Sequence, residues 1–91
     1  MSASAVRVWI SGRVQGVCFR AATCEQAELR GVRGWVRNRS DGSVEAWFEG
    51  EPAAVEQLVA WCHRGPEYAA VEHVEVSPVE PKGETRFYVT R

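Results

Sequence analysis

Residues 34–50 read GWVRNRSDGSVEAWFEG, and this stretch sets the arrangement of the whole chain. Two strand-like runs, GWVRN at 34–38 and SVEAWFEG at 43–50, enclose the tetrapeptide Arg39-Ser40-Asp41-Gly42. An Asp-Gly pair readily adopts the positive φ angles of a tight turn, so the two runs are predicted to pair as antiparallel strands of a hairpin. The other elements can be placed outward from this hairpin.

The segment before the hairpin predicts one strand and one helix. In VRVWI at 6–10 the apolar residues alternate with polar or amphipathic ones, which is the period of a strand with one buried face. We expect this strand to stop at Gly12. Residues 20–29, RAATCEQAEL, contain no Gly or Pro and are rich in helix formers, and Gly31 follows where a helix C-cap belongs.

The segment after the hairpin predicts a second helix and two more strands. Pro52 suits the first turn of a helix, apolar residues recur at helical spacing from Val55 to Cys62, and Gly65-Pro66 ends the run. The sequence VEHVEVSPV at 71–79 alternates again, and residues 85–90 give a last short strand.

The resulting order is βαββαβ followed by a short terminal strand. Right-handed crossovers place the first and third strands in the centre and both helices on the same side. The predicted fold class is therefore α+β, a ferredoxin-like sandwich whose antiparallel sheet carries two helices on one face, in a single domain of residues 1–91. In this topology residues 12–20 and Asn38 meet at one edge of the sheet.

Composition limits the possible partners. The 91 residues are 45% apolar, and 11 basic against 12 acidic side chains give a net charge of −1, so no broad cationic field exists for nucleic acid or an anionic membrane. Cys18, Cys24 and Cys62 are odd in number and lack CxxC spacing, which argues against a disulfide framework or a zinc site. The N-terminus has no long apolar run. We expect a cytoplasmic monomer with reduced thiols.

The loop after the first strand, GRVQGVCFR at 12–20, has the composition of an anion cradle. A glycine-containing loop that leads into a helix N-terminus exposes backbone N–H groups and the positive end of the helix dipole. Gly12 and Gly16 allow close approach to an oxygen ligand, and Arg20 offers a planar fork suited to phosphate. The alternative is that the glycines only form a turn and that Arg20 is a solvated helix residue.

Other phosphate chemistries do not match the sequence. A Walker motif is absent, and Cys18 lies only two residues before Arg20, too close for a cysteine phosphatase loop. The histidines and the acidic residues of the first predicted helix are interpreted as surface groups. Asn38 remains, as a carboxamide that holds an attacking water or, alternatively, as a hairpin-flanking residue that bonds its own backbone.

These residues resemble the acylphosphatase family. The resemblance rests on VWISGRVQGVCFR at 8–20 and GVRGWVRNRSDGSVEAWFEG at 31–50, and it continues through VEQLVAWCHRGP, VEHVEV and the terminal RFYV. It implies a hydrolase that cleaves the carboxyl–phosphate bond of acyl phosphates without a metal or another cofactor, with phosphate or sulfate as a competing anion. By position, Arg20 binds the phosphoryl group, Asn38 orients the nucleophilic water, and the phosphate-binding loop consists of Gln15, Gly16, Val17, Cys18, Phe19 and Arg20.

Two rival classes stay open at this point. One is a non-catalytic module that binds an anion or a nucleic acid on the same fold; the charge balance and the single aromatic residue of the first strand, Trp9, argue against it. The other is a regulatory domain that handles carbamoyl phosphate. The topology also brings the final residue, Arg91, toward the cradle edge, where its carboxylate is a candidate partner for Arg20.

Overall fold

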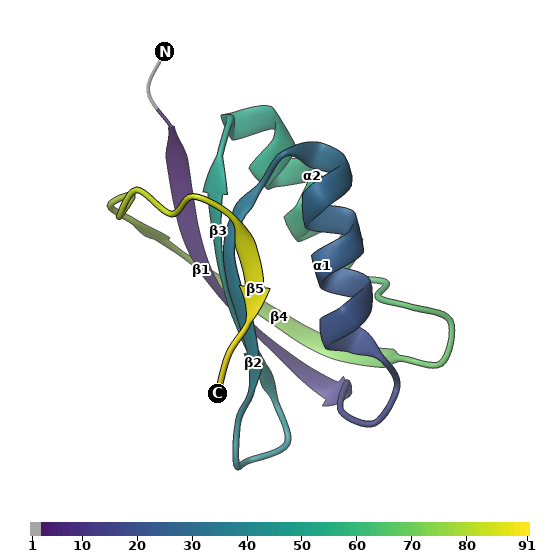
Figure 1. Cartoon of the computed structure of the whole chain (residues 1–91). Coiled ribbons are helices and arrows are strands. Elements are labelled where there is room, and N and C mark those ends of the chain that lie inside the picture. Colours follow the sequence, from purple (N-terminus) through teal and green to yellow (C-terminus); the bar gives the residue numbers. More distant parts are fainter. Residues whose placement is uncertain (1–2) are drawn as a thin grey trace.

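The computed structural model describes residues 3–91, and its elements follow the predicted order (Figure 1). In chain order they are β1 (Ser4–Arg13), α1 (Phe19–Arg30), β2 (Arg33–Asn38), β3 (Val44–Gly50), α2 (Pro52–Cys62), β4 (Ala70–Val79) and β5 (Phe87–Val89). Most boundaries lie within a few residues of the predicted ones, and β5 falls inside the predicted range 85–90.

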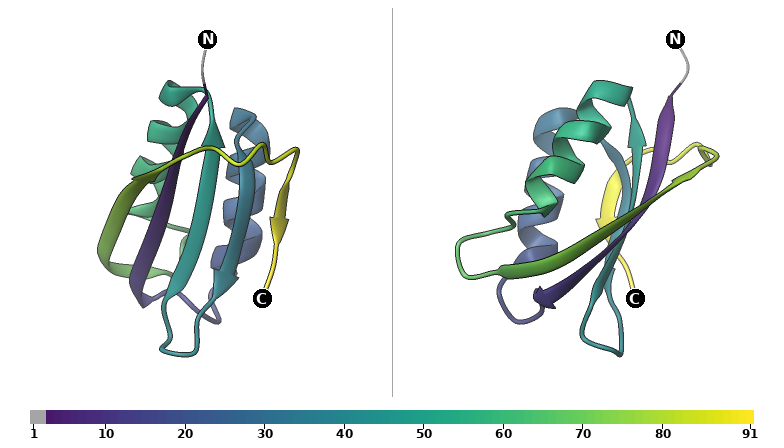
Figure 2. Two further views of the ribbon diagram at one scale, coloured as in Figure 1. Left: turned by 90° about the vertical axis from the view of Figure 1, so that its left-hand side faces the viewer. Right: turned by 180° about the vertical axis from the view of Figure 1, so that it is seen from behind.

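The five strands form one sheet in the order β4-β1-β3-β2-β5. The pairs β1–β3, β1–β4 and β2–β3 are antiparallel, and β5 runs parallel to β2. Both helices lie side by side on one face of the sheet, and the other face is left uncovered by helices (Figure 2). The predicted ferredoxin-like sandwich, with its first and third strands in the centre, is confirmed.

The core lies between the helices and the sheet. On β3, Val44, Ala46 and Phe48 point into this core, and the residues between them therefore point to the open face. From the helices, Phe19, Leu58 and Trp61 pack onto the same cluster, with the rings of Phe19 and Trp61 5.5 Å apart between centroids. The ring of Phe19 thereby anchors the start of α1 to α2.

The first strand does not stop at Gly12, as the sequence predicted, but continues to Arg13. Its pairing with β4 shifts register between Ser11 and Gly12, which is the mark of a β-bulge. Gly12 has φ +118°, and a Cβ atom there would lie 2.3 Å from the carbonyl oxygen of Ala70. Gly12 thus has the unusual φ angle that the sequence predicted, but its missing side chain allows the close approach of β4, and Gly12 does not line the cavity described below.

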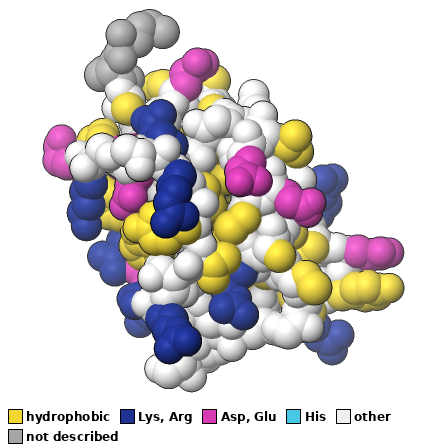
Figure 3. Space-filling view, in the orientation of Figure 1, with side chains coloured by type: hydrophobic (Ala, Val, Ile, Leu, Met, Phe, Trp, Pro, Cys, Tyr) yellow, Lys and Arg dark blue, Asp and Glu magenta, His cyan; other side chains and the backbone are white. Residues whose placement is uncertain are grey.

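Charge is spread unevenly over the surface despite the net value of −1. Lys and Arg side chains stand along the left-hand side of the molecule in Figure 3, on the side of the sheet away from the helices. On this open face the guanidinium groups of Arg7 and Arg37 lie over the rings of Trp9 and Trp35, and Trp35 stacks on Trp47. These aromatic rings are thus engaged within the protein. No helix in residues 3–91 is long and apolar enough to cross a membrane.

Candidate active site

A cavity of about 500 Å³ lies where the loop after β1, the start of α1 and the ends of β2 and β5 come together. Its lining consists of Val14, Gln15, Gly16, Cys18, Phe19, Arg20, Ala21, Asn38 and Val89. The structure thus brings together the two predicted catalytic residues and most of the predicted phosphate-binding loop. Val17 does not line the cavity, because its side chain packs against the core.

The loop before α1 has the backbone geometry of an anion-binding nest. Gly16 has φ +75°, and Cys18, a residue with a side chain, adopts the left-handed conformation with φ 63° and ψ 24°. Successive N–H groups that turn through such conformations can converge on one anion. Within residues 3–91, the backbone N–H groups of residues 15–19 donate to no backbone carbonyl, and no side chain caps the N-terminus of α1. These donors are therefore available to a ligand.

Val14 and Phe19 hold the two ends of this loop. Both side chains are buried in the core, at 1% exposure each, whereas Gly16, Cys18 and Arg20 are exposed. Arg20 is the second residue of α1 and reaches the cavity from the positive end of the helix dipole. The loop is consequently fixed at both ends and open to solvent in the middle, as a site that exchanges a small ligand requires.

Asn38, the last residue of β2, enters the cavity from the sheet side. Its Oδ1 atom is buried and, in the described part of the chain, accepts no hydrogen bond. A buried acceptor without a partner costs about 1–3 kcal/mol, so such groups in native proteins call for an explanation. The alternative of a side chain that bonds its own backbone through this oxygen is not supported by the structure. Because Asn38 lines the cavity, its carboxamide is a candidate to hold a water molecule there.

The side chain of Gln15 has a role that the sequence did not reveal. Its Nε2 atom donates to the carbonyl oxygens of Arg39 and Ser43, at 2.8 and 2.9 Å. These two carbonyls belong to the turn of the β2–β3 hairpin, so Gln15 ties the loop before α1 to the hairpin that ends β2. Sequence reasoning counted Gln15 only for its backbone N–H.

The remaining candidate groups are poorly suited to catalysis. Cys18 is exposed at the cavity, while burial raises the pKa of Cys62 to about 12 and, together with the charge of Glu28, raises the pKa of Cys24. His63 and His73 are exposed and do not line the cavity. Within residues 3–91, no three His, Cys, Asp or Glu side chains gather closely enough to hold a metal ion.

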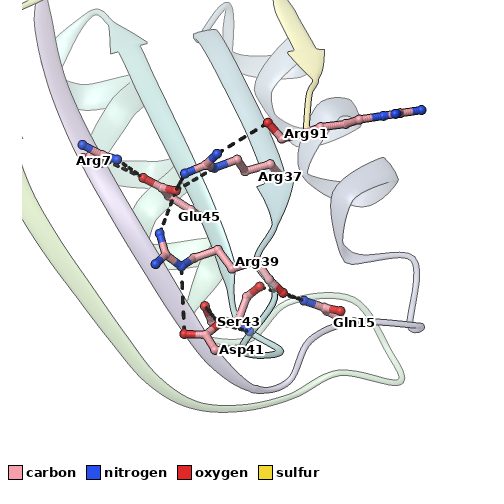
Figure 4. A network of polar contacts seen from close by, with 8 residues as sticks. All are labelled: Arg7, Gln15, Arg37, Arg39, Asp41, Ser43, Glu45 and Arg91. Atoms are coloured by element: carbon pink, nitrogen blue, oxygen red, sulfur yellow. Dashed lines mark hydrogen bonds and ion pairs between the residues drawn. The ribbon is translucent and has the colours of Figure 1, made fainter.

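The end of the chain makes a different contact from the one that the sequence suggested. The carbonyl oxygen of Arg91 accepts a hydrogen bond from Nη1 of Arg37, at 3.5 Å, on the open face of the sheet (Figure 4). The polar partner found for Arg91 is thus Arg37 and not Arg20. Val89, two residues earlier, contributes the β5 side of the cavity.

Comparisons with known proteins agree with this geometry. The sequence profile of the acylphosphatase family matches residues 6–89. An acylphosphatase of Gloeobacter violaceus is 57% identical over 98% of both chains. The solved structure of an acylphosphatase from Coxiella burnetii superposes with a TM-score of 0.94 and 35% identity, covering 98% of this chain and 94% of that one. A crystal structure of full-length HypF in the phosphate- and nucleotide-bound form matches with a TM-score of 0.92 and 26% identity, over 99% of this chain and 12% of HypF.

The fold and the site define a small α+β sandwich with a nest of backbone N–H groups, one arginine and one carboxamide around a single cavity. Sequence identity above half over nearly the whole length makes the assignment specific. The chain belongs to the acylphosphatase family, a family of hydrolases.

Proposed function

We propose that this protein hydrolyses the carboxyl–phosphate bond of acyl phosphates to a carboxylate and inorganic phosphate by direct attack of water. The observation that carries the proposal is the cavity itself. It joins the open backbone nest of residues 15–19, the guanidinium of Arg20 and the unpartnered Oδ1 of Asn38. The family membership supplies the substrate class.

The nest and Arg20 bind the phosphoryl group. The N–H groups of residues 15–19 donate to the phosphoryl oxygens, and Arg20 adds a two-pronged, charge-assisted contact beside the positive end of α1. Because these donors are already in position, the negative charge that spreads over the phosphoryl oxygens in the transition state is stabilised without rearrangement of the protein. Inorganic phosphate or sulfate competes with the substrate for the same donors.

Asn38 positions the nucleophile. Its Oδ1 accepts a hydrogen bond from a water molecule whose oxygen attacks phosphorus. The bond between phosphorus and the bridging oxygen breaks, its electron pair leaves with the carboxylate, and the proton lost by the water passes to the phosphate product. A carboxylate is a stable anion, so no general acid is needed at the leaving group. The reaction needs no cofactor.

We also propose that the protein is a cytoplasmic monomer with one domain over residues 1–91. Three free cysteines support a reducing compartment, and every described strand belongs to one sheet, which supports a single domain. A disulfide-linked form isolated from cells, or a dimer by light scattering, would contradict these assignments.

Turnover measurements test the proposal. Benzoyl phosphate, acetyl phosphate and carbamoyl phosphate are offered to the purified protein with and without inorganic phosphate. We expect hydrolysis of the acyl phosphates and competitive inhibition by phosphate. Binding of phosphate without any turnover would indicate a non-catalytic anion-binding module, and turnover confined to carbamoyl phosphate would indicate a carbamoyl-phosphate-handling domain.

A further inference from the structure

A fully buried carboxylate lies on the open face of the sheet, directly behind the strand end that carries Asn38. Glu45 of β3 has 0% exposure, and three arginines converge on it, namely Arg7 from β1, Arg37 from β2 and Arg39 from the hairpin (Figure 4). These arginine side chains retain 33–40% exposure and screen the carboxylate from solvent. Glu45 lines no part of the cavity.

Two of these arginines are the sequence neighbours of Asn38. Nε of Arg37 donates to Oε1 of Glu45 at 2.7 Å, and Nη1 of Arg39 donates to the same oxygen at 3.1 Å. Side chains alternate between the faces of a strand, so both neighbours point to the open face while Asn38 points to the helix side. The residues on either side of Asn38 are therefore tied to one oxygen atom.

The same hairpin also holds the nest. Gln15 donates to the carbonyl oxygens of Arg39 and Ser43, and the backbone N–H of Arg39 donates to the carbonyl of Ser43 at 2.8 Å. Arg39 thus joins the Glu45 carboxylate on one face to the loop before α1 on the other. This connection links the strand end that carries Asn38 to the nest.

No hydrogen bond in the described chain fixes the oxygen of Asn38. Its Oδ1 has no partner within residues 3–91, so its direction follows from the position of the backbone at the end of β2. A misplacement of about 1 Å in a group that orients a reactant can cost about 100-fold in rate. A side chain that helps to fix this backbone, in addition to the pairing of Asn38 with Val44 on β3, is consequently important for the reaction.

We propose that Glu45 is a positioning residue for the hydrolysis, because through Arg37 and Arg39 it holds Asn38 at the correct distance from the phosphate-binding nest. This inference rests on the proposed function. Glu45 touches neither substrate nor water, and its effect on the reaction passes entirely through the strand end.

The chain offers a matched control for Glu45. Glu49 lies on the same strand and the same face, is 1% exposed, and accepts four hydrogen bonds at the opposite end of β3. We compare Glu45→Gln with Glu49→Gln for thermal unfolding, for kcat and KM with benzoyl phosphate, and for the inhibition constant of inorganic phosphate, well below both melting temperatures. Both changes are expected to lower Tm. Only Glu45→Gln is expected to lower kcat, by about tenfold, with phosphate inhibition changed by less than about threefold.

A milder pair of variants covers the case in which Glu45→Gln does not fold. Arg39→Gln removes one of the two ties beside Asn38, and Arg7→Gln removes a contact to Glu45 that does not involve a neighbour of Asn38. We expect kcat to fall several-fold in Arg39→Gln and to stay within about twofold in Arg7→Gln. Equal kcat values for the two members of each pair would overturn the proposal.

A spectroscopic measurement separates this inference from the proposed function. Asn38 is the only asparagine in the sequence, so labelling with ¹⁵N-asparagine gives one side-chain ¹⁵N signal, which is correlated with its two amide protons. We expect Glu45→Gln to shift or broaden that signal, free and with inorganic phosphate, while Glu49→Gln leaves it in place. An unmoved signal in Glu45→Gln overturns the positioning role even in an active protein. If the signal moves in Glu45→Gln but the wild-type protein hydrolyses no acyl phosphate, the structural link is sustained and the proposed function is rejected.

Discussion

Two places at opposite ends of the sheet offer consecutive backbone N–H groups to an anion, and they differ in what fills them. At one end the carboxylate of Glu49 accepts hydrogen bonds from the N–H groups of Lys82, Gly83 and Glu84 at 2.8–2.9 Å, and from the indole of Trp47 at 3.0 Å. At the other end, the N–H groups of residues 15–19 have no backbone acceptor within residues 3–91.

Burial accounts for the different roles of the two places. At this end the anion is the side chain of Glu49 itself, which is 1% exposed. It holds the connection between β4 and β5 against the sheet. Gly16, Cys18 and Arg20 are exposed, so an anion at the cradle can enter and leave. The same backbone chemistry stabilises the fold where it is closed and, in the function that we propose, provides the substrate site where it is open. Changes at the two ends should therefore separate activity from stability.

The largest effect is expected from Arg20→Lys at the open end. A point charge cannot reproduce the planar, two-pronged contact of a guanidinium with phosphate oxygens, so kcat/KM should fall by about 100-fold, corresponding to about 3 kcal/mol. Because Arg20 is exposed, Tm should move by no more than about 3 °C. Steady-state kinetics and thermal unfolding check this, with the exposed Arg64→Lys as the control. Wild-type turnover in Arg20→Lys would contradict the assignment of the site.

Asn38→Ala should separate water positioning from anion binding at the open end. We expect kcat to fall by about 10- to 100-fold, because the water loses its acceptor, and the inhibition constant of phosphate to change by less than about threefold. Inhibition kinetics in the same buffer give both numbers. A collapse of phosphate affinity would show instead that Asn38 binds the anion.

At the closed end, Glu49→Gln should lower the free energy of unfolding by about 2 kcal/mol, because charge-assisted hydrogen bonds to a buried carboxylate are weakened. At 25 °C, where the variant is still folded, kcat should remain close to the wild-type value. Chemical denaturation and benzoyl phosphate turnover measure the two quantities. An unchanged free energy of unfolding would contradict the comparison between the two ends. A low kcat in the folded variant would contradict it as well.

The smallest effect concerns pH. Burial pushes the pKa of Glu49 up, but hydrogen bonds from Trp47 and the backbone N–H groups of residues 82–84 outweigh it and hold that pKa below its usual value. Burial also pushes the pKa of Glu45 up, but the hydrogen bonds and charges of Arg37 and Arg7 outweigh it, so the pKa of Glu45 lies below its usual value. A lowered folded-state pKa gives stability that is present above the unfolded value, about 4.3, and is lost as the pH falls through the folded value.

Thermal unfolding between pH 7 and pH 2 should therefore show a level Tm down to about pH 5 and a progressive fall below it. Glu49→Gln should show a shallower fall, since it has one fewer carboxylate to protonate. An identical acid slope in wild type and variant would mean that Glu49 does not contribute its charge to stability.

The local pattern of the sequence predicted the elements well and the long-range contacts poorly. Asp41-Gly42 and the alternation on either side specify the hairpin by themselves, and Arg20 and Asn38 stood out through their resemblance to a family motif. Gly12 has the positive φ angle that was predicted, but the group that approaches it is the backbone of Ala70, 58 residues further along the chain, and not a ligand. The residues next to Gly12 in the sequence do not indicate that contact.

The polar network behind the site was equally invisible in the sequence. Glu45 appears in SVEAWFEG as an ordinary polar residue of an alternating strand, and only the folded sheet brings Arg7 to it from 38 residues away. The side-chain bonds of Gln15 to the hairpin span 24 and 28 residues. Such pairings require the register of the strands to be known before they can be proposed.

The Glu49 contacts also constrain the order in which the chain can fold. Their backbone donors lie 33–35 residues further along the chain, so these contacts close a much longer loop than the central hairpin does. Until they do, a carboxylate destined for the interior has to stay hydrated, because an unpaired buried charge is strongly unfavourable. Burial of Glu49 on the open face of the sheet therefore requires the segment before β5 to be in place. Because burial of Glu49 and docking of the segment before β5 depend on each other, we expect the C-terminal residues to fold in the same cooperative transition as the core.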